Sequence, residues 1–166
     1  MGVEKGLMKD LETAIRLRNE GKAKEALELL IPLAEAYPSD AAVHYQCAWS
    51  FDVLGQERQA VYYYEKAISL GLDEKDLSDA YLGLGSTYRT LGDYEKSRDV
   101  LLRGMALFPQ DNALKTFYAM SLYNLGEHAD AMGLLLTLLA DTASDARIKS
   151  YAKAIRFYSG ALDQVW

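Results

Sequence analysis

Between residues 7 and 140, hydrophobic side chains recur at spacings of three and four residues, with polar side chains between them. An α-helix places such positions on one face, whereas a half-buried strand needs an alternation that this chain does not show. The pattern therefore predicts an all-α protein built from pairs of helices. The first helices are expected over 7–20, 41–54, 75–91 and 112–125, and the second over about 23–36, 57–70, 94–107 and 128–140.

Four glycines at the ends of the first helices mark an internal repeat. Gly21, Gly55, Gly92 and Gly126 lie 34, 37 and 34 residues apart, and small residues follow them at a constant offset: Ala26, Ala60, Ser97 and Ala131. Glycine is common at helix ends because it tolerates the left-handed backbone conformation. A period of this length is typical of one helix-turn-helix unit copied in tandem, each copy burying its apolar face on the next.

Small residues also stand seven positions before each glycine, at Ala14, Ala48, Gly85 and Ala119. Two helices approach closely only where neither carries a long side chain at the contact. We therefore expect the two helices of each unit to meet at these small residues, while bulky side chains such as Phe51 and Tyr64 fill the space between units.

The ends of the second helices carry separate signals. Pro38 and Pro109 fall just beyond two of them, where a residue without an amide donor stops a helix. Either Ser39 or Asp40 is expected to cap the next helix, and Asp111 is expected to cap the first helix of the fourth unit.

The third unit shows the pattern most completely, as Tyr81-x-x-Leu84-Gly85-x-x-Tyr88 followed by Gly92, Asp93, Tyr94, Ser97, Leu101 and Pro109. This pattern resembles the tetratricopeptide repeat (TPR), a helix-turn-helix unit of about 34 residues. The resemblance covers about residues 7–143 and implies a right-handed superhelical stack of antiparallel hairpins, a TPR-like α-solenoid. Four units are expected within residues 1–143, at about 7–40, 41–74, 75–111 and 112–143, followed by a C-terminal capping helix within 144–166.

Two features depart from a regular repeat. Pro32 lies inside the second helix of the first unit, where it lacks an amide donor and collides with the preceding turn, so a bend or a break is expected near residues 29–31. The 37-residue spacing adds three residues within 71–76. With Asp73 or Asp76 as a helix cap, these residues either lengthen the first helix of the third unit or enlarge the loop before it.

The C-terminal segment contains one more amphipathic pattern. Ile148, Tyr151, Ile155, Tyr158 and Leu162 recur at spacings of three and four, and Trp166 follows four residues later. This pattern predicts a single helix with charged residues on its opposite side. Two interpretations stay open: the helix covers the otherwise exposed apolar end of the stack, or it binds a partner.

The concave face of such a stack is lined by the side of each first helix that does not pack against its own second helix. Counting from the glycines gives a mainly aromatic and aliphatic surface. The candidate partner-binding residues are Leu11, Ile15, Tyr45, Trp49, Leu82, Arg89, Phe117, Met120 and Tyr123. Exposed apolar area of this extent marks an interface, and aromatic residues and arginines dominate measured binding energies. The alternative is that Tyr45, Trp49 and Met120 only pack against neighbouring first helices.

One TPR subtype holds the C-terminal carboxylate of chaperone tails with lysines, an arginine and asparagines in this groove. In this chain, Leu11 and Ile15, or Tyr45 and Trp49, occupy the places of that lysine and asparagine. We therefore do not expect binding of chaperone tails. Two functions remain open: an adaptor or scaffold that binds a peptide or helix of a protein partner in the groove, and a self-associating homo-oligomer whose groove receives its own or another copy's C-terminal helix.

Composition narrows the partners and the location. The 166 residues carry a net charge of -6, which disfavours phosphate backbones and anionic lipids, so neither nucleic acid nor a membrane is expected as a partner. No apolar run approaches the length of a membrane span, the first residues lack the order of a secretion signal, and the single cysteine is compatible with a reducing compartment. A cytoplasmic protein is the expectation.

No motif in the sequence points to catalysis. No glycine-rich loop ends in the Lys-Ser or Lys-Thr that a phosphate site needs. His44 and Cys47 share a helical face, but both fall on packing positions, which favours core packing over a thiolate–imidazole pair. His128 lies far from His44 in the stack. We therefore expect no enzymatic activity, no cofactor and no metal site.

Overall fold

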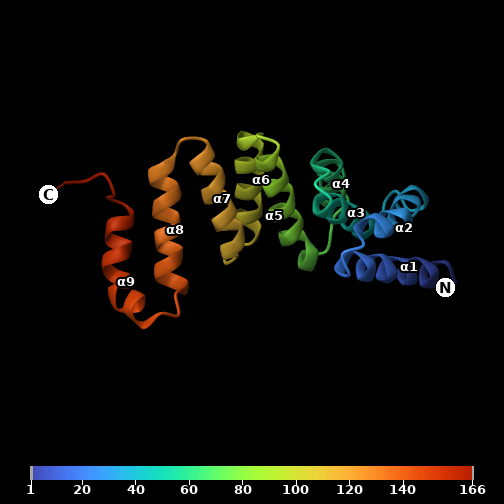
Figure 1. The fold of residues 1–166 in the computed structure, drawn as a ribbon, viewed down its shortest axis with the longest axis horizontal. Helices are drawn as coiled ribbons and strands as arrows, with labels where there is room; N and C mark the ends of the chain where they lie inside the picture. Colours follow the sequence, from blue (N-terminus) through green and yellow to red (C-terminus); the bar gives the residue numbers. More distant parts are fainter. Residues whose placement is uncertain (1, 166) are drawn as a thin grey trace.

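The computed structural model describes residues 2–165, with side chains from residue 6 onwards, and this part of the chain forms nine α-helices. They are α1 (Gly2–Asn19), α2 (Ala23–Ala36), α3 (Ala41–Val53), α4 (Glu57–Ser69), α5 (Glu74–Thr90), α6 (Tyr94–Leu107), α7 (Asn112–Asn124), α8 (His128–Thr142) and α9 (Ala146–Ser159). Each helix packs against the next, so the chain advances as a row of helix pairs with its termini at opposite ends (Figure 1). The prediction of an all-α stack is confirmed.

The predicted helix bounds agree with the structure to within two residues at nearly every end. The exception is α1, which begins at Gly2 instead of residue 7. α2 and α6 have the predicted bounds, and α8 continues to Thr142. This agreement follows from strong local signals at the helix ends, where a glycine or a capping carboxylate stops or starts the helix.

The repeated glycines lie in the turns between the two helices of each pair. Their φ angles range from 67° at Gly55 to 85° at Gly126, and no other residue type has a positive φ in the described chain. A side chain at these positions would strain the turn. Between pairs, Asp40 caps α3 by accepting a hydrogen bond from Val43 N at 3.0 Å, and Asp111 caps α7 in the same way.

Close packing within a pair depends on the small residues that the repeat places there. In the third unit, a Cβ atom added to Gly85 would lie 2.5 Å from Leu101 Cγ, inside van der Waals contact. The Ser97 hydroxyl donates a hydrogen bond of 2.6 Å to Gly85 O across the same contact. Ala26 and Ala60 are fully buried at the matching place in their own units. The prediction that the helices meet at small residues is confirmed.

Pro32 and the three extra residues before the third unit affect the helices differently. α2 is continuous through Pro32, so the helix does not break there, and the alternative expectation of a bend stays a prediction. Leu30 and Ala34, on either side of the proline, are both buried, and their packing holds the helix together while Pro32 itself is exposed. The three extra residues before the third unit lengthen α5, which has 17 residues where α3 and α7 have 13. Asp73 precedes α5, but its side chain accepts no capping hydrogen bond.

The first helices form one layer and the second helices another. α1 contacts α3, α3 contacts α5 and α5 contacts α7, whereas within residues 2–165 the second helices make no contacts with one another. Because neighbouring first helices lie closer together than neighbouring second helices, the stack curves toward the first helices. α1, α3, α5 and α7 therefore line the concave side, which we call the concave layer.

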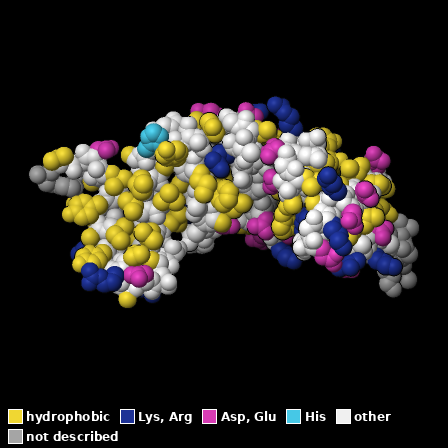
Figure 2. All heavy atoms as spheres, in the orientation of Figure 1, with side chains coloured by type: hydrophobic (Ala, Val, Ile, Leu, Met, Phe, Trp, Pro, Cys, Tyr) yellow, Lys and Arg dark blue, Asp and Glu magenta, His cyan; other side chains and the backbone are white. Residues whose placement is uncertain are grey.

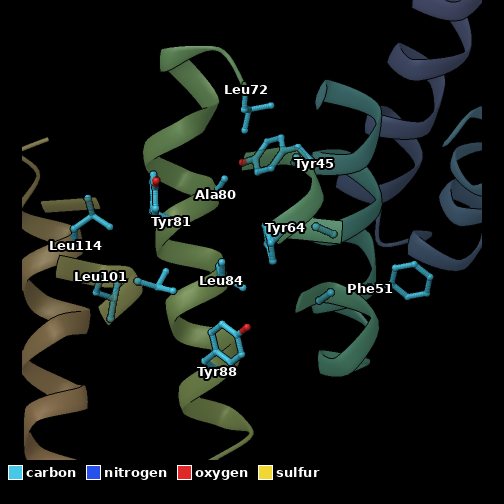
Figure 3. Close-up of a cluster of buried hydrophobic side chains, with 14 of the residues drawn as sticks. Tyr45, Phe51, Tyr64, Leu72, Ala80, Tyr81, Leu84, Tyr88, Leu101 and Leu114 are labelled. Carbon is cyan, nitrogen blue, oxygen red and sulfur yellow. The ribbon is translucent and has the colours of Figure 1, made fainter. Parts of the chain in front are cut away.

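The core is continuous through the central units and small at the C-terminal end. The largest buried cluster extends from Leu27 on α2 to Leu114 on α7, and its tyrosine and leucine side chains fill the space between α3, α4 and α5 (Figure 3). The cluster between α7 and α8 contains Ala119, Leu122 and Ala131. Most of the hydrophobic stabilisation is therefore located before α8.

The C-terminal helix differs from its prediction in length and register. α9 ends at Ser159, so Leu162 lies beyond it, and Trp166 lies outside the described residues. Tyr151 and Tyr158 are exposed, which contradicts their place in the predicted packing stripe. The side chains turned toward α8 are half-buried instead: Ile148, Ala152, Ile155 and Ser159.

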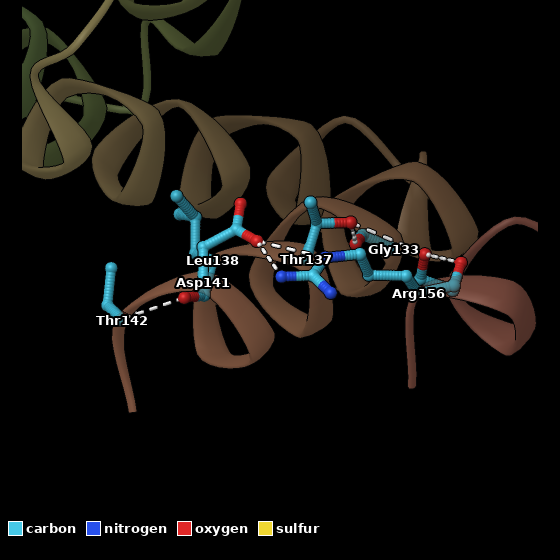
Figure 4. Close-up of polar contacts among 7 residues, drawn as sticks. Gly133, Thr137, Leu138, Asp141, Thr142 and Arg156 are labelled. Carbon is cyan, nitrogen blue, oxygen red and sulfur yellow. Dashed lines mark hydrogen bonds and ion pairs between the residues drawn. The ribbon is translucent and has the colours of Figure 1, made fainter. Parts of the chain in front are cut away.

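The register of α9 is set by contacts with α8. Gly133 approaches Ser159 so closely that an added Cβ would lie 2.5 Å from Ser159 O. The hydroxyls of Thr137 and Ser159 are 3.3 Å apart, and Arg156 forms a 2.7 Å ion pair with Asp141 (Figure 4). The face of α9 that carries Ile148, Ala152, Ile155 and Ser159 therefore packs on α8, and Tyr151 and Tyr158 are exposed.

Candidate binding surface

The nine candidate residues all lie on helices of the concave layer, but they differ in accessibility. Tyr45 is 2% exposed, whereas Trp49, Met120 and Tyr123 are 39%, 38% and 62% exposed. The others are half-buried: Leu11, Ile15, Leu82, Arg89 and Phe117. Tyr45 thus packs mainly against its neighbours, which agrees with the alternative interpretation for this residue. Among the nine candidates, the accessible apolar surface is concentrated at Trp49 and on α7.

The Arg18 side chain connects α1 to α3 through contacts with two residues of α3. Its guanidinium lies 3.8 Å from the centre of the Trp49 ring and donates a hydrogen bond to the side chain of Gln46. Burial lowers the pKa of Arg18, and no carboxylate among the described residues forms an ion pair with it. The cation–π contact covers one face of Trp49 and partly compensates the buried charge.

A cavity of about 220 Å³ lies between α3 and α5. Its lining, hereafter the Tyr45 pocket, consists of Tyr45, Trp49, Asp52, Tyr64, Asp79, Leu82 and Gly83. The Asp52 carboxylate accepts hydrogen bonds from the hydroxyls of Tyr64 at 3.2 Å and Thr87 at 3.4 Å. Burial nevertheless raises the pKa of Asp52, because the two hydrogen bonds do not replace the lost hydration.

A larger cavity of about 350 Å³ lies between α7 and α8, beside the end of α5. Its lining, hereafter the α7–α8 cavity, consists of Arg89, Ala119, Met120, Tyr123, Asn124, His128, Ala131, Met132 and Leu135. Arg89 Nη1 donates a 3.4 Å hydrogen bond to Asn124 Oδ1, but the buried Arg89 Nε has no partner in the described chain. The cavity is therefore mainly apolar, and the Arg89 side chain in its lining carries one buried N–H group without a partner.

The α7–α8 cavity exists because the concave layer ends at α7. Each earlier first helix contacts the next first helix, but α9 contacts α8 and makes no contact with α7 in the described chain. Figure 2 shows hydrophobic side chains gathered over α7, α8 and α9, while charged side chains are more frequent toward the N-terminal end. The apolar surface is thus largest where the layer stops.

Sequence reasoning missed part of this surface. His128, Met132 and Leu135 line the cavity from α8, a second helix, and the search was confined to first helices. The apolar pair Met132 and Leu135, three residues apart on a helix face, was an available signal. Asp52 and Asp79 lie three residues from Trp49 and Leu82, so spacing placed them on the concave face without indicating that they share a pocket.

His44 and Cys47 do not form a reactive pair. His44 Nε2 lies 3.0 Å from Pro38 O, and the Cys47 thiol points to Leu30 O at 3.6 Å. Burial raises the pKa of Cys47 to about 12, so its thiol is protonated at neutral pH. These contacts favour core packing for both residues.

The described residues contain neither a candidate metal-binding cluster nor a candidate membrane-spanning helix. Their histidine, cysteine and carboxylate side chains nowhere form a group of three or more that could hold a metal ion. Among the helices of residues 2–165, none is both long enough and apolar enough to span a membrane.

Comparison with known sequences identifies repeats of one type. A family model described as "Tetratrico peptide repeat" matches residues 41–162. The chain is 27% identical over 154 residues to the aspartyl/asparaginyl beta-hydroxylase of Mus musculus, covering 88% of this chain and 21% of that protein. It is 36% identical over 98 residues to the BBSome complex member BBS4 of Xenopus tropicalis, covering 59% and 18%. The chain thus spans about a fifth of the length of these relatives.

Solved structures show the same fold. MamA superposes with a TM-score of 0.70 at 14% identity, covering 99% of this chain and 81% of that chain. YrrB, described as a TPR protein with an unusual peptide-binding site, superposes with a TM-score of 0.71 at 19% identity, covering 92% and 80%. The Cut9–Hcn1 hetero-tetramer of APC/C gives a TM-score of 0.71 at 19% identity, covering 90% and 29%. At these identities the likeness concerns the fold alone.

Proposed function

This chain belongs to the tetratricopeptide repeat family, and we propose that it is a protein-interaction module that binds a peptide or helix of a partner protein along its concave layer. The observation that carries the proposal is the α7–α8 cavity, an apolar recess of about 350 Å³ that is already open without a ligand. Recesses of this size hold ligand groups in other proteins.

The chemistry of the cavity fits a large apolar side chain. Met120 and Met132 line opposite sides from α7 and α8, and their flexible thioethers adapt to the shape of the group that enters. Tyr123 adds an exposed aromatic ring, a residue type that often dominates binding energy. An apolar anchor residue in this cavity would therefore supply much of the affinity for a partner segment.

Arg89 supplies the polar contact that orients such a segment. Its Nε–H is buried beside the cavity without a hydrogen-bond acceptor in the described chain. A buried donor without a partner is costly, and a backbone carbonyl of the bound segment would satisfy it once the Arg89 side chain turns this N–H toward the cavity. The proposed site thus combines an apolar anchor with one directional hydrogen bond.

The comparisons support an interaction role without naming a partner. YrrB is described as binding a peptide, and Cut9–Hcn1 is an assembly of different chains. The hydroxylase relatives are matched over about a fifth of their length, so the activity in their name is not transferred to this chain.

A random peptide library selected on the full chain tests the proposal. Fluorescence polarisation then gives the affinity of each recovered peptide for the wild type, for Tyr123→Ala and for Tyr62→Ala. Tyr62 on α4 is a matched control, because it is 60% exposed and Tyr123 is 62% exposed. We expect Tyr123→Ala to weaken binding by about tenfold or more and Tyr62→Ala to change it less than about twofold. Equal affinities for all three proteins would overturn the proposal.

Self-association is a second candidate, favoured by the exposed aromatic side chains of α9. Tyr151 is 55% exposed, and hydrophobic side chains gather over α8 and α9 (Figure 2). Another copy could cover this surface with its own α9. Light scattering over a concentration series, on the full chain and on a chain that ends at residue 143, tests this. A monomer at every concentration in both proteins would exclude it.

A further inference from the structure

The Tyr45 side chain is 2% exposed, yet its hydroxyl has no hydrogen-bond partner among the described residues. The Tyr45 ring packs between Trp49 and Tyr64, with ring centres 5.9 Å and 6.2 Å away, and its hydroxyl is directed toward α5 (Figure 3). That hydroxyl makes no hydrogen bond within the described residues. Tyrosine hydroxyls of buried residues usually have a partner. Tyr45 lines the pocket and its oxygen is not among the fully buried unpartnered atoms, so the oxygen is accessible to a group that enters the pocket.

Two carboxylates of the same pocket also lack cationic partners. Neither Asp52 nor Asp79 forms an ion pair with any described lysine, arginine or histidine. Burial raises the pKa of Asp79, and the nearby carboxylates of Asp111 and Asp76 raise it further. The pocket therefore concentrates negative charge that nothing in this part of the chain neutralises.

Arg18, which stacks on the Trp49 ring, does not cancel this charge. Burial raises the pKa of Tyr45, and Asp79 and Asp76 raise it more strongly than Arg18 lowers it. The electrostatic environment of the Tyr45 hydroxyl is thus negative on balance. Arg18 is instead occupied by the Trp49 ring and the Gln46 side chain.

The walls of the pocket fit a long side chain with a charged end. Leu82 and the edge of Trp49 offer apolar surface to an aliphatic stem, and the pocket volume of about 220 Å³ leaves room for one such chain. A cation beside aromatic rings and carboxylates gains both cation–π and charge-assisted hydrogen-bond energy. Lysine and arginine have this combination of stem and charge.

We propose that the Tyr45 pocket binds a lysine or arginine side chain of the partner segment whose apolar residue enters the α7–α8 cavity. The charged end donates hydrogen bonds to the Asp79 and Asp52 carboxylates and to the Tyr45 hydroxyl oxygen. This inference rests on the proposed function and specifies the chemistry of the partner: a basic residue and an apolar residue in one segment. The net charge of -6 favours the approach of such a segment.

Charge-removing substitutions in the selected peptides test this assignment. Each lysine is replaced by norleucine and each arginine by citrulline, which keeps the length of the side chain. We expect one position at which the replacement weakens binding to the wild type by about tenfold or more. The same replacement should weaken binding to Asp79→Asn by a clearly smaller factor than binding to the wild type, because one of the two partner carboxylates is already neutral there.

Tyr45→Phe separates binding from stability. The substitution removes the hydroxyl alone and keeps the ring in the core, so we expect an unchanged melting temperature. Affinity for the basic peptide should fall by about tenfold or more, since one hydrogen bond to a charged group is lost. Glu28→Gln on α2 is the control: it removes one exposed negative charge from the other layer and should change affinity less than about twofold.

The possible outcomes distinguish this inference from the proposed function. Peptides weakened by Tyr123→Ala but unaffected by Asp79→Asn and Tyr45→Phe would overturn the basic pocket and leave the apolar anchor intact. The reverse pattern would support the basic pocket and overturn the apolar anchor. Recovery of no binding peptide would overturn both. A dimer that Asp79→Asn converts to a monomer would identify a second copy as the occupant and overturn the assignment to a partner segment.

Discussion

Leu101 on α6 and Leu135 on α8 both lie nine residues after the repeated glycine of their unit, yet their surroundings are opposite. Leu101 is fully buried in the central core, whereas Leu135 is 37% exposed and lines the α7–α8 cavity. α7 contacts α5 and closes the space beside Leu101. α9 contacts only α8 in the described chain, so the space beside Leu135 stays open.

This difference shows how one repeat produces both a core and a binding surface. Local sequence makes each hairpin alike, because the same glycine and the same small residues return in every unit. Whether a hairpin's apolar face is buried depends on the next first helix, which belongs to the following unit. The candidate site therefore lies where the contact between first helices is missing.

Truncation of the two equivalent leucines should give the largest difference in stability. Leu101→Ala removes a fully buried side chain and should cost about 2–5 kcal/mol. Leu135→Ala should cost about 1 kcal/mol or less, because this side chain is already partly in water and its loss enlarges an existing cavity. Urea denaturation measures both values. Similar losses would mean that the C-terminal unit is as well packed in solution as the central ones.

Enlarging the small residue after the glycine should give the next largest difference. Ala60→Leu inserts a side chain into a close contact between helices and should cost about 1–3 kcal/mol. Ala131 occupies the same repeat position and is also buried, but it lines the α7–α8 cavity, so the added atoms of Ala131→Leu have more space than those of Ala60→Leu. Thermal denaturation should show the larger drop in melting temperature for Ala60→Leu. A larger drop for Ala131→Leu would contradict the inference that the α7–α8 cavity has space for the added side-chain atoms.

Gly133→Ala should weaken the packing of α9 on α8 while leaving the stability of the central units unchanged. The new Cβ would lie 2.5 Å from Ser159 O, a backbone atom that moves only with the end of α9. Since α9 has no buried side chain within Ala146–Ser159, the global cost should be about 1 kcal/mol or less. Amide hydrogen exchange should accelerate in α9 and stay constant in α5. Unchanged protection of α9 would show that this contact does not hold the helix.

Asp52→Asn should give the smallest change, with a defined dependence on pH. Burial raises the pKa of Asp52 above its unfolded value, so the folded protein binds this proton more tightly than the unfolded chain does. Protonation therefore stabilises the fold, and that stabilisation is lost as pH rises through the folded pKa. Asn keeps an acceptor for Tyr64 without the charge, so the variant should be slightly more stable at neutral pH, by less than about 1 kcal/mol.

Melting temperatures of the wild type and Asp52→Asn across the acidic range check this sign. The advantage of the variant should shrink as pH falls and Asp52 becomes protonated in the wild type. An advantage that grows on acidification would mean that the Tyr64 and Thr87 hydrogen bonds outweigh the desolvation of the carboxylate. In that case the ionised Asp52 carboxylate would stabilise the fold instead of destabilising it.

The candidate site was only partly predictable from the residue pattern. Trp49, Met120 and Tyr123 were selected by helical spacing and are exposed on the concave layer. Tyr45 was selected by the same count but is buried, because α5 packs over it from another unit. The contribution of α8 to the cavity was missed for a similar reason: it depends on α9 not contacting α7.

The amino-acid sequence by itself determined the helices, their ends and their pairing, because these depend on residues close together in the chain. A glycine that accepts positive φ, a capping aspartate and two facing small residues act within one hairpin. The tertiary structure decided the register of α9, the burial of Tyr45 and the two pockets. Each of these depends on contacts between units, where a side chain meets residues far away in sequence whose positions local spacing does not define.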